Sequence, residues 1–219
     1  MMDKENNHIA SALLLDLPWA SLLGYAWKFF RKILRGLSQE GIYEVLDFRS
    51  ALEILDENGE KAHYTKEKKV RYLQDDVITY QDHAWGDGKI LLNYKCSPGK
   101  AVDQYRSGYK TNILISLREI KNRGDIDKFY IHWEMKDCFL MADEYWGTDI
   151  TQRTKKITIE VTFPKKRKPY RVFLEESNRR KSQYLSKSNF HHLPDGRVKV
   201  SCTIKKPRLY EHYLLRWAW

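Results

Sequence analysis

Cysteine is scarce in this sequence of 219 residues, and the three that occur, Cys96, Cys138 and Cys202, lie far apart. None of them belongs to a CxxC pair, so the spacing fits neither a disulfide framework nor a zinc motif. We therefore expect a reduced, cytoplasmic setting in which the three thiols serve as small apolar residues of a core.

The sequence also lacks the short motifs that identify common enzyme classes. It contains no GxSxG, no P-loop, no GxGxxG and no HExxH, and its acidic residues do not follow the spacing of an EF-hand. A thiol nucleophile at Cys96, or a glycosidase pair formed by Asp82 with Glu134 or Asp87, is compatible with the residue types, but nothing in the sequence fixes such a geometry. We expect a non-enzymatic protein, and we expect no cofactor.

Alternation of strands and helices is absent from residue 42 onward, which argues against a doubly wound sheet. Short runs with period-two alternation take its place, and polar turns separate them. One such run places Ile157, Ile159, Val161 and Phe163 on a single face. About ten runs of this kind predict an all-β fold over residues 42–219, either an antiparallel β-sandwich or a barrel-like domain.

Three segments of this domain carry the most specific signals. Asn58-Gly59 lies between two strand-like runs and predicts a hairpin. We interpret residues 66–69, KEKK in the returning run, as a solvated face or an edge. The last ten residues, YEHYLLRWAW, place four large side chains on one face and predict a core-facing strand: Tyr213, Leu215, Trp217 and Trp219.

The region before residue 42 has a different character, and we expect residues 1–41 to form a helical arm. Apolar residues recur at helical spacing between residues 9 and 37, with a break near Pro18. Asp16 and Pro18 interrupt the apolar run, which argues against a secretory signal and against a membrane-spanning helix. Four cations gather near the end of the segment and favour an amphipathic helix: Lys28, Arg31, Lys32 and Arg35.

The apolar face of this arm is too large to be left in water. We expect it to dock onto a partner protein or an oligomer mate through five residues: Trp19, Leu23, Trp27, Phe30 and Leu34. Aromatic residues of this kind also sit at membrane interfaces. A membrane-associated protein is therefore an alternative, with the arm lying on a membrane surface or spanning the bilayer.

Positive charge is in excess, with 39 Lys and Arg against 29 Asp and Glu and a formal net charge of +10. Such a balance favours contact with nucleic acid or another polyanion. The candidate anion-binding residues lie in two segments: Lys165, Lys166, Arg167 and Lys168, then Arg179, Arg180 and Lys181. Lys205, Lys206 and Arg208 form a third basic segment, and loops that share one end of a sandwich could bring two of the three together. Tyr170, Tyr184 and Tyr210 are nearby aromatic residues on which bases could stack.

Negative charge is concentrated in residues 71–88, RYLQDDVITYQDHAWGDG, where four aspartates could place oxygen atoms around a divalent cation: Asp75, Asp76, Asp82 and Asp87. A divalent-metal-dependent hydrolase is therefore a further alternative. The same residues also suit a structural role. In that interpretation Asp75, Asp76 and Asp87 shape turns, and Asp82 pairs with a nearby lysine or arginine.

The aromatic last strand, the Trp85-Gly86-Asp87-Gly88 turn and the apolar N-terminal segment together resemble small β-sandwich modules that accompany bacterial regulatory or defence proteins. The resemblance implies an accessory component of such a complex. It includes no diagnostic motif, so it assigns no functional residues. The sequence as a whole predicts a recognition or assembly module.

Overall fold

The structure, a computed structural model, describes residues 41–219. The expected arm and its five docking residues, Trp19, Leu23, Trp27, Phe30 and Leu34, lie outside the described residues. Residues 41–219 form fourteen strands and one short 3-10 helix. Their bounds are β1 (Tyr43–Ile54), β2 (Lys61–Tyr72), β3 (Val77–Ala84), β4 (Lys89–Ser97), β5 (Lys100–Ser107), β6 (Lys110–Lys121), β7 (Ile126–Lys136), β8 (Asp143–Asp149), β9 (Lys156–Phe163), β10 (Arg171–Glu176), β11 (Lys181–Tyr184), η1 (Lys187–Asn189), β12 (Phe190–His192), β13 (Val198–Lys205) and β14 (His212–Ala218).

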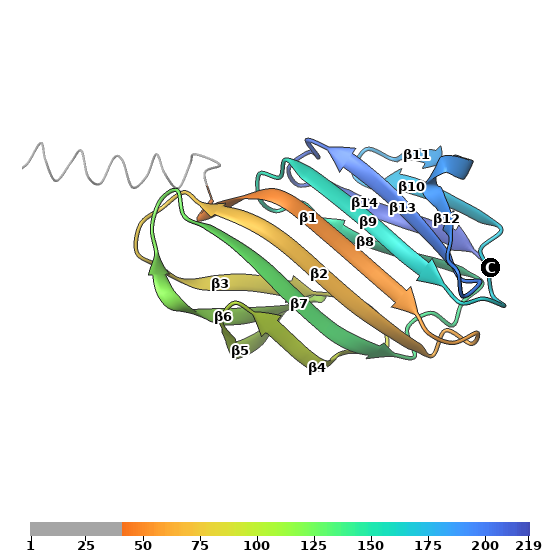
Figure 1. Cartoon of the computed structure of the whole chain (residues 1–219), viewed down its shortest axis with the longest axis horizontal. Coiled ribbons are helices and arrows are strands. Elements are labelled where there is room, and N and C mark those ends of the chain that lie inside the picture. Colours follow the sequence, from red (N-terminus) through yellow and green to blue (C-terminus); the bar gives the residue numbers. More distant parts are fainter. Residues whose placement is uncertain (1–40) are drawn as a thin grey trace, which may run out of the picture. The chain divides into compact units, whose positions relative to one another are not determined.

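The strands form three sheets, which confirms an all-β fold (Figure 1). The largest has seven strands in the order β12-β13-β9-β1-β2-β7-β4, the second has the order β11-β10-β14-β8, and the third has the order β3-β6-β5. Each order has two free ends, so none of the sheets within residues 41–219 closes into a barrel. The sandwich-like prediction is therefore the better of the two alternatives.

The seven-stranded sheet is mixed, which corrects the prediction of a purely antiparallel arrangement. β1 pairs with β2 in antiparallel register but with β9 in parallel register, from Phe48 opposite Ile157 to Glu53 opposite Thr162. A local alternation of apolar and polar residues is the same for both directions, so the pattern in the sequence could not reveal this pairing.

Both smaller sheets pack on the same face of the seven-stranded sheet. On β2, Tyr64 contacts the ring of Trp146 from β8, with 4.7 Å between ring centroids. Two residues further along the same face of β2, Lys66 reaches Asp82 from β3. The four-stranded sheet thus covers the β9–β1 half of the large sheet, and the three-stranded sheet covers the β2–β7 half.

Large aromatic side chains fill the space between these layers. Tyr80 of β3 stacks on Phe129 of β7 at 3.9 Å between centroids, and Phe163 of β9 meets Trp217 of β14 edge-on at 5.3 Å. All four are at most 1% exposed. Because burial of one such side chain contributes about 1.5–3 kcal/mol, these contacts are a main source of the stability of the β body.

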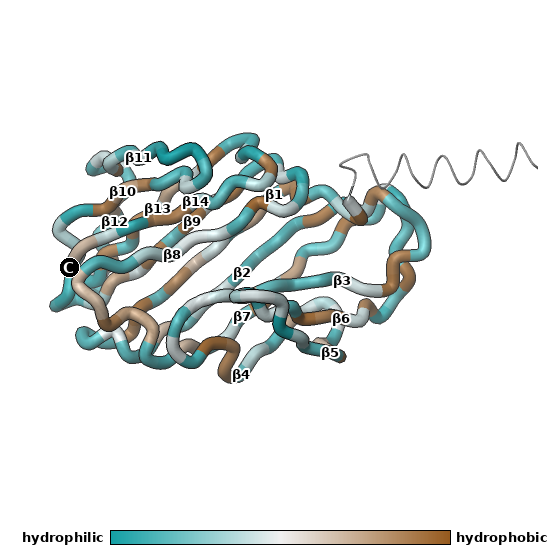
Figure 2. The backbone as a smooth tube through the Cα atoms, turned by 180° about the vertical axis from the view of Figure 1, so that it is seen from behind, coloured by the Kyte–Doolittle hydropathy of each residue, from teal (hydrophilic) through white to brown (hydrophobic). Residues whose placement is uncertain are grey.

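The last strand confirms the prediction made from its aromatic residues. β14 lies between β10 and β8, and Tyr213, Leu215 and Trp217 are buried, whereas Trp219 follows the strand and is only partly buried against the core. Figure 2 shows the apolar residues recurring along the strands, with polar residues over the turns and the β11 edge. The hairpin expected at Asn58-Gly59 is also present, since it joins β1 to β2 and Gly59 has a φ of 79°.

Residues 66–69 contradict the interpretation as a solvated face or edge. β2 is an interior strand between β1 and β7, and Lys66 and Lys68 are only 4% and 7% exposed. Their side chains point into the space under the three-stranded sheet, while Glu67 points to the opposite face. There Glu67 pairs with Arg49 at 2.7 Å and with Lys128 at 2.9 Å.

Four strands were not expected from the sequence: β5, β8, β11 and β12. β5 and β11 are sheet edges whose residues are almost all exposed, and β12 has only three residues. Such strands bury too little on either face to show a period of two. Within the described residues, no helix has the length and apolar character needed to cross a bilayer.

Candidate functional site

A group of charged and polar side chains from β2, β3 and β4 lies in the interior of the body. Lys66 Nζ is 2.7 Å from Asp82 Oδ1 and donates a second hydrogen bond of 2.8 Å to the main-chain carbonyl of His83. The Tyr94 hydroxyl donates to the other oxygen of Asp82 at 3.2 Å. Asp82 is fully buried, so the ion pair predicted for this residue exists, but it belongs to the core rather than to the surface.

The electrostatics of this group favour an ionised Asp82. Burial by itself would raise the pKa of the Asp82 carboxyl, but the charges on Lys66 and then Lys68 outweigh burial and lower it. Burial, and after it the charges on the same two lysines, lower the pKa of His83 to about 3. The imidazole is therefore neutral at physiological pH.

Lys68 is the unusual member of the group, because it has no carboxylate partner within 4 Å among residues 41–219. Its ammonium nitrogen lies 4.5 Å from the centroid of the Phe48 ring, a cation–π contact that replaces only part of its hydration. Burial lowers the pKa of Lys68 to about 7, and the charge on Lys66 acts in the same direction. The amine is thus half-protonated near neutral pH.

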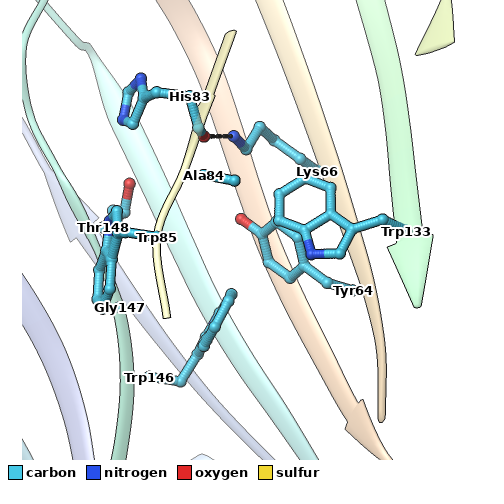
Figure 3. A pocket seen from close by; sticks show the side chains of 9 residues that line it. All are labelled: Tyr64, Lys66, His83, Ala84, Trp85, Trp133, Trp146, Gly147 and Thr148. Carbon is cyan, nitrogen blue, oxygen red and sulfur yellow. Dashed lines mark hydrogen bonds between the residues drawn. The ribbon is translucent and has the colours of Figure 1, made fainter. Parts of the chain in front are cut away.

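A small cavity adjoins the group, and Figure 3 shows the residues that line it. Lys66 points toward the carbonyl of His83, and the rings of Tyr64 and Trp133 lie beside the lysine stem (Figure 3). The cavity has a volume of about 10 Å³, which is roughly the space of one water molecule. The charged group therefore serves to join the sheets, and its cavity does not accommodate a larger substrate.

The remaining aspartates of residues 71–88 lie in turns. Asp75 accepts a hydrogen bond of 3.0 Å from the main chain of Arg123, Asp76 has a φ of 59°, and the carbonyl of Asp87 accepts a 2.8 Å contact from Cys138 Sγ. Within residues 41–219, no three His, Cys, Asp or Glu side chains are grouped so as to hold a metal ion. The structure thus does not bring Asp75, Asp76, Asp82 and Asp87 together.

The two predicted anion-binding segments lie at opposite ends of one strand. Residues 165–168 precede β10, whereas Arg179, Arg180 and Lys181 follow it, so the length of β10 separates them. These two are therefore not the pair of basic segments that one end of the fold brings together. The third basic segment, Lys205 to Arg208, lies on the same side as residues 179–181.

Several contacts join the segments of this side. Main-chain Lys206 N donates to Lys155 O at 2.7 Å, and the side chain of Asn178 donates to the carbonyl of Tyr210 at 2.5 Å. Tyr210 N in turn donates to Ile150 O at 2.7 Å. We call this side of the body the basic end. It has five exposed cations with no ion-pair partner among the described residues: Arg153, Arg180, Lys205, Lys206 and Arg208.

The chain enters the β body at the basic end. Val45 N donates to Arg153 O at 2.8 Å, and Gly41 lies directly against the side chain of Gln152. Figure 1 shows β1 and β9 beginning, and β13 ending, toward this side of the body. Tyr210 is 63% exposed and Ile42 is 44% exposed, so apolar surface accompanies the charge.

The opposite end is also basic in sequence, but several of its cations already contact an aromatic ring, a main-chain carbonyl or a carboxylate. Arg167 stacks on Trp219 with 3.9 Å between its guanidinium carbon and the ring centroid, and it donates to the carbonyl of Glu57. Lys166 pairs with Glu57 at 3.3 Å. Leu55, Asp56, Glu57, Asn58, Pro164, Lys165, Asp195 and Arg197 line a wide hollow of mixed charge here. Tyr170 lies at this end, and Tyr184 pairs with Phe173 near the start of β10.

Sequence reasoning missed two features of these sites. It did not single out Arg153, because an isolated arginine between Gln152 and Thr154 carries no pattern. It also placed Lys66 and Lys68 in solvent, although both continue the period-two phase of Ala62, Tyr64, Val70 and Tyr72. That phase was the signal that could have identified them as inward-facing.

A comparison with models of known protein families finds no match, and neither does a comparison with curated proteins. Among solved structures, 80% of this chain is similar to 42% of an M1 zinc metallopeptidase from Deinococcus radiodurans, with 8% sequence identity and a TM-score of 0.47. A putative protease from Parabacteroides distasonis is similar over 81% of this chain and 40% of its own, with 9% identity and a TM-score of 0.48. The chain thus spans less than half the length of these two proteins.

Proposed function

We propose that this protein is a non-enzymatic recognition or assembly module, in which the β body is a scaffold and the N-terminal segment docks onto a partner protein or an oligomer mate. The observation that supports this most directly is that residues 41–219 assemble a hydrophobic core from their own strands. In this proposal the apolar residues of the N-terminal segment make a contact outside that core. Five of them would form it: Trp19, Leu23, Trp27, Phe30 and Leu34.

The proposal has a direct test in the full chain. A photo-reactive amino acid at Trp27 should cross-link to one protein in the cell, either a second copy or another partner. The same amino acid at Val102, which is 56% exposed on the β5 edge, is the control and should not couple to that protein. Cross-links from Trp27 that reach only lipid or only residues 41–219 of the same molecule would contradict the proposal.

A second measurement distinguishes specific docking from non-specific hydrophobic association. The double variant Leu23→Asp with Phe30→Asp should abolish the cross-link from position 27. If the partner is a second copy, the variant should also sediment with a lower coefficient than the wild-type oligomer. The matched control is Ile78→Asp with Ile120→Asp, which changes two apolar residues of the three-stranded sheet that are 58% and 61% exposed. Equal losses in the two variants would show that the effect is not specific to the N-terminal segment.

A second candidate function is the binding of a polyanion or an anionic ligand, and the basic end favours it. Five exposed cations without ion-pair partners among residues 41–219 gather there from three loops, and such a group attracts phosphate-bearing surfaces in a salt-dependent manner. Arg153→Gln with Lys205→Gln and Arg208→Gln should elute from immobilised heparin at markedly lower salt than the wild type. Lys165→Gln with Lys166→Gln and Lys168→Gln removes the same charge from the opposite end and should shift elution less.

A further inference from the structure

We infer that the basic end binds single-stranded nucleic acid, with the Tyr210 ring as a platform on which one base stacks while the surrounding cations hold the neighbouring phosphates. This inference rests on the second candidate function and deepens it, because it names a ligand that carries bases as well as negative charge. The juxtaposition that carries it is an exposed tyrosine with a fixed backbone among the cations of three segments: 150–155, 177–180 and 205–211.

The first step of the argument is that the carboxylates of the basic end are already neutralised or buried. Glu44 pairs with Arg71 at 3.0 Å, and Glu176 pairs with Arg179 at 3.0 Å. Glu211 is only 3% exposed, and its carboxylate accepts two main-chain hydrogen bonds. The five exposed cations named above thus form a surface of net positive charge, which attracts phosphate groups in a salt-dependent manner.

The second step is the way in which the fold presents Tyr210. Its backbone has a φ of 61°, a conformation that a large side chain keeps only where the surrounding structure enforces it. Two neighbouring segments do so here, because Tyr210 N donates to Ile150 O at 2.7 Å and the Tyr210 carbonyl accepts from the Asn178 side chain at 2.5 Å. Arg180 and Lys206 also have positive φ, 51° and 50°. Since this backbone is fixed before a ligand arrives, binding costs less conformational entropy.

The third step is that Tyr210 differs from the other strongly exposed tyrosines. Tyr109 and Tyr170 each have a basic side chain near the ring, at 5.3 and 5.4 Å from the centroid, and the ring of Tyr184 meets another aromatic ring at 5.9 Å. Within residues 41–219, no such contact involves the Tyr210 ring, which is 63% exposed. Any base can stack on a free aromatic face, while the phosphates beside it meet the cations of the same end.

Stacking and charge predict opposite preferences between single strands and duplexes. The bases of a duplex are already paired and stacked on each other, so an exposed ring has no base face to bind. A duplex carries more phosphates per unit length than a single strand, so a surface that senses charge alone would bind the duplex at least as tightly. A preference for single strands is therefore the signature of a stacking platform.

The test measures binding of the full chain to a labelled strand of about twelve nucleotides, as RNA and as DNA, by fluorescence anisotropy. The wild type should bind both single strands more tightly than the duplex of the same sequence. Tyr210→Leu should weaken single-strand binding about ten-fold, because one stacked base is lost, whereas Tyr210→Trp keeps a ring and should bind at least as tightly as the wild type. The matched control is Tyr184→Leu, which changes a tyrosine that is 71% exposed elsewhere and should leave binding within about two-fold.

Heparin separates the contribution of the bases from that of the charge, because it is a polyanion without bases. Tyr210→Leu should elute from immobilised heparin at the same salt concentration as the wild type. Arg153→Gln with Lys205→Gln and Arg208→Gln should weaken binding to both heparin and the single strands. For the strands, this variant should also reduce the slope of log affinity against log salt concentration by about two, as expected for three lost phosphate contacts.

Three outcomes overturn the inference. If the duplex binds as tightly as the single strands, or if Tyr210→Leu binds them as the wild type does, charge alone determines binding, and the second candidate function stands without this ligand. Binding to vesicles with about one-third phosphatidylserine that requires Arg153, Lys205 and Arg208, without binding of either single strand, would identify a membrane surface as the partner instead. Heparin elution and strand binding that are both unchanged in the triple variant would reject the inference and the second candidate function together.

Discussion

At the scale of single residues, the unusual feature is a charged group that the fold has placed inside an aromatic core. Asp82 is fully buried and Lys66 nearly so, and each is the main counter-charge of the other. A pair of this kind gains little net stability over a well-packed apolar pair, because both ions lose their hydration. Removal of only one partner is far more costly.

The first prediction follows from this asymmetry. Asp82→Asn should lower the free energy of unfolding by about 3–5 kcal/mol, because Lys66 is then a buried charge without a counter-ion. Lys66→Met with Asp82→Leu should cost much less than Asp82→Asn, and it should leave stability within about 2 kcal/mol of the wild type. Urea denaturation of the three proteins measures both values. If the double variant is as unstable as Asp82→Asn, the pair has a role that apolar packing does not replace.

Lys68 leads to the second prediction, which concerns pH. Its pKa falls from 10.5 in the unfolded chain to about 7 in the folded protein, so the unfolded state binds more protons between these values. The folded state is therefore penalised progressively as the pH falls from 10.5 toward 7. Lys68→Met removes the titrating group, so this variant should be more stable than the wild type at pH 7, and its advantage should shrink by about 2 kcal/mol by pH 9.

Urea denaturation of wild type and Lys68→Met at pH 7, 8 and 9 measures the difference. Subtraction of the two curves cancels the titration of all other groups that the substitution leaves unchanged. A difference that stays constant with pH would show that Lys68 keeps its proton throughout, and that the Phe48 ring and Asp82 compensate for its burial.

At the scale of elements, the hairpin between β1 and β2 depends on one glycine. Gly59 has a φ of 79°, and a Cβ atom at this position would overlap the main-chain oxygen of Phe139. The chain passes so closely here because Phe139 N donates to Gly59 O at 3.1 Å, which ties the hairpin to the segment after β7. Only glycine permits both the backbone conformation and this approach.

The third prediction compares two glycines that differ in this respect. Gly59→Ala should lower the free energy of unfolding by more than about 2 kcal/mol, because strain and a backbone clash add together. Gly124 also has a positive φ, 97°, but no atom of residues 41–219 lies within 4 Å of the place that a Cβ would take, so Gly124→Ala should cost only about 1 kcal/mol. Thermal denaturation of the two variants measures the difference. An equal fall in melting temperature would show that the β1–β2 turn moves away from Phe139 at no cost in stability.

The elements also show how far the sequence could predict this fold. Strands with large apolar residues on one face, such as β9 and β14, were evident in the sequence because large apolar residues recur there at every second position without interruption. β2 was assigned as a strand, but the two lysines in its apolar phase were misplaced, since a lone sequence gives no sign of the partner that lies on β3. Edge strands such as β5 escaped notice because they bury little.

At the scale of the whole molecule, the candidate sites depended on which loops share an end. The charge of each basic segment is evident in the sequence, but the arrangement of the segments is not, because the strand order decides whether two loops meet. Thus residues 165–168 and 179–181 are separated by β10, while Arg153, Lys205 and Arg208 come together from loops more than 50 residues apart. The described residues therefore define a surface that no single stretch of sequence carries.

The fourth prediction belongs to this scale. A protein that begins at Gly41 should unfold cooperatively, with a melting temperature within about 3 °C of the full chain, because its strands supply their own core. Scanning calorimetry and near-ultraviolet circular dichroism measure this. A truncated protein without a cooperative transition would show that residues 1–40 belong to the core, and the proposed docking role would lose its basis.

The parallel pairing of β1 with β9 has a consequence for folding during translation. Residues 48 and 157 become neighbours only after more than a hundred intervening residues have been made, so the central sheet stays unfinished for most of translation. Contacts between such distant residues make folding slow, because the intervening chain must be gathered first. During that interval the edge of β1 that later pairs with β9 is open to other strands, including those of a second nascent copy.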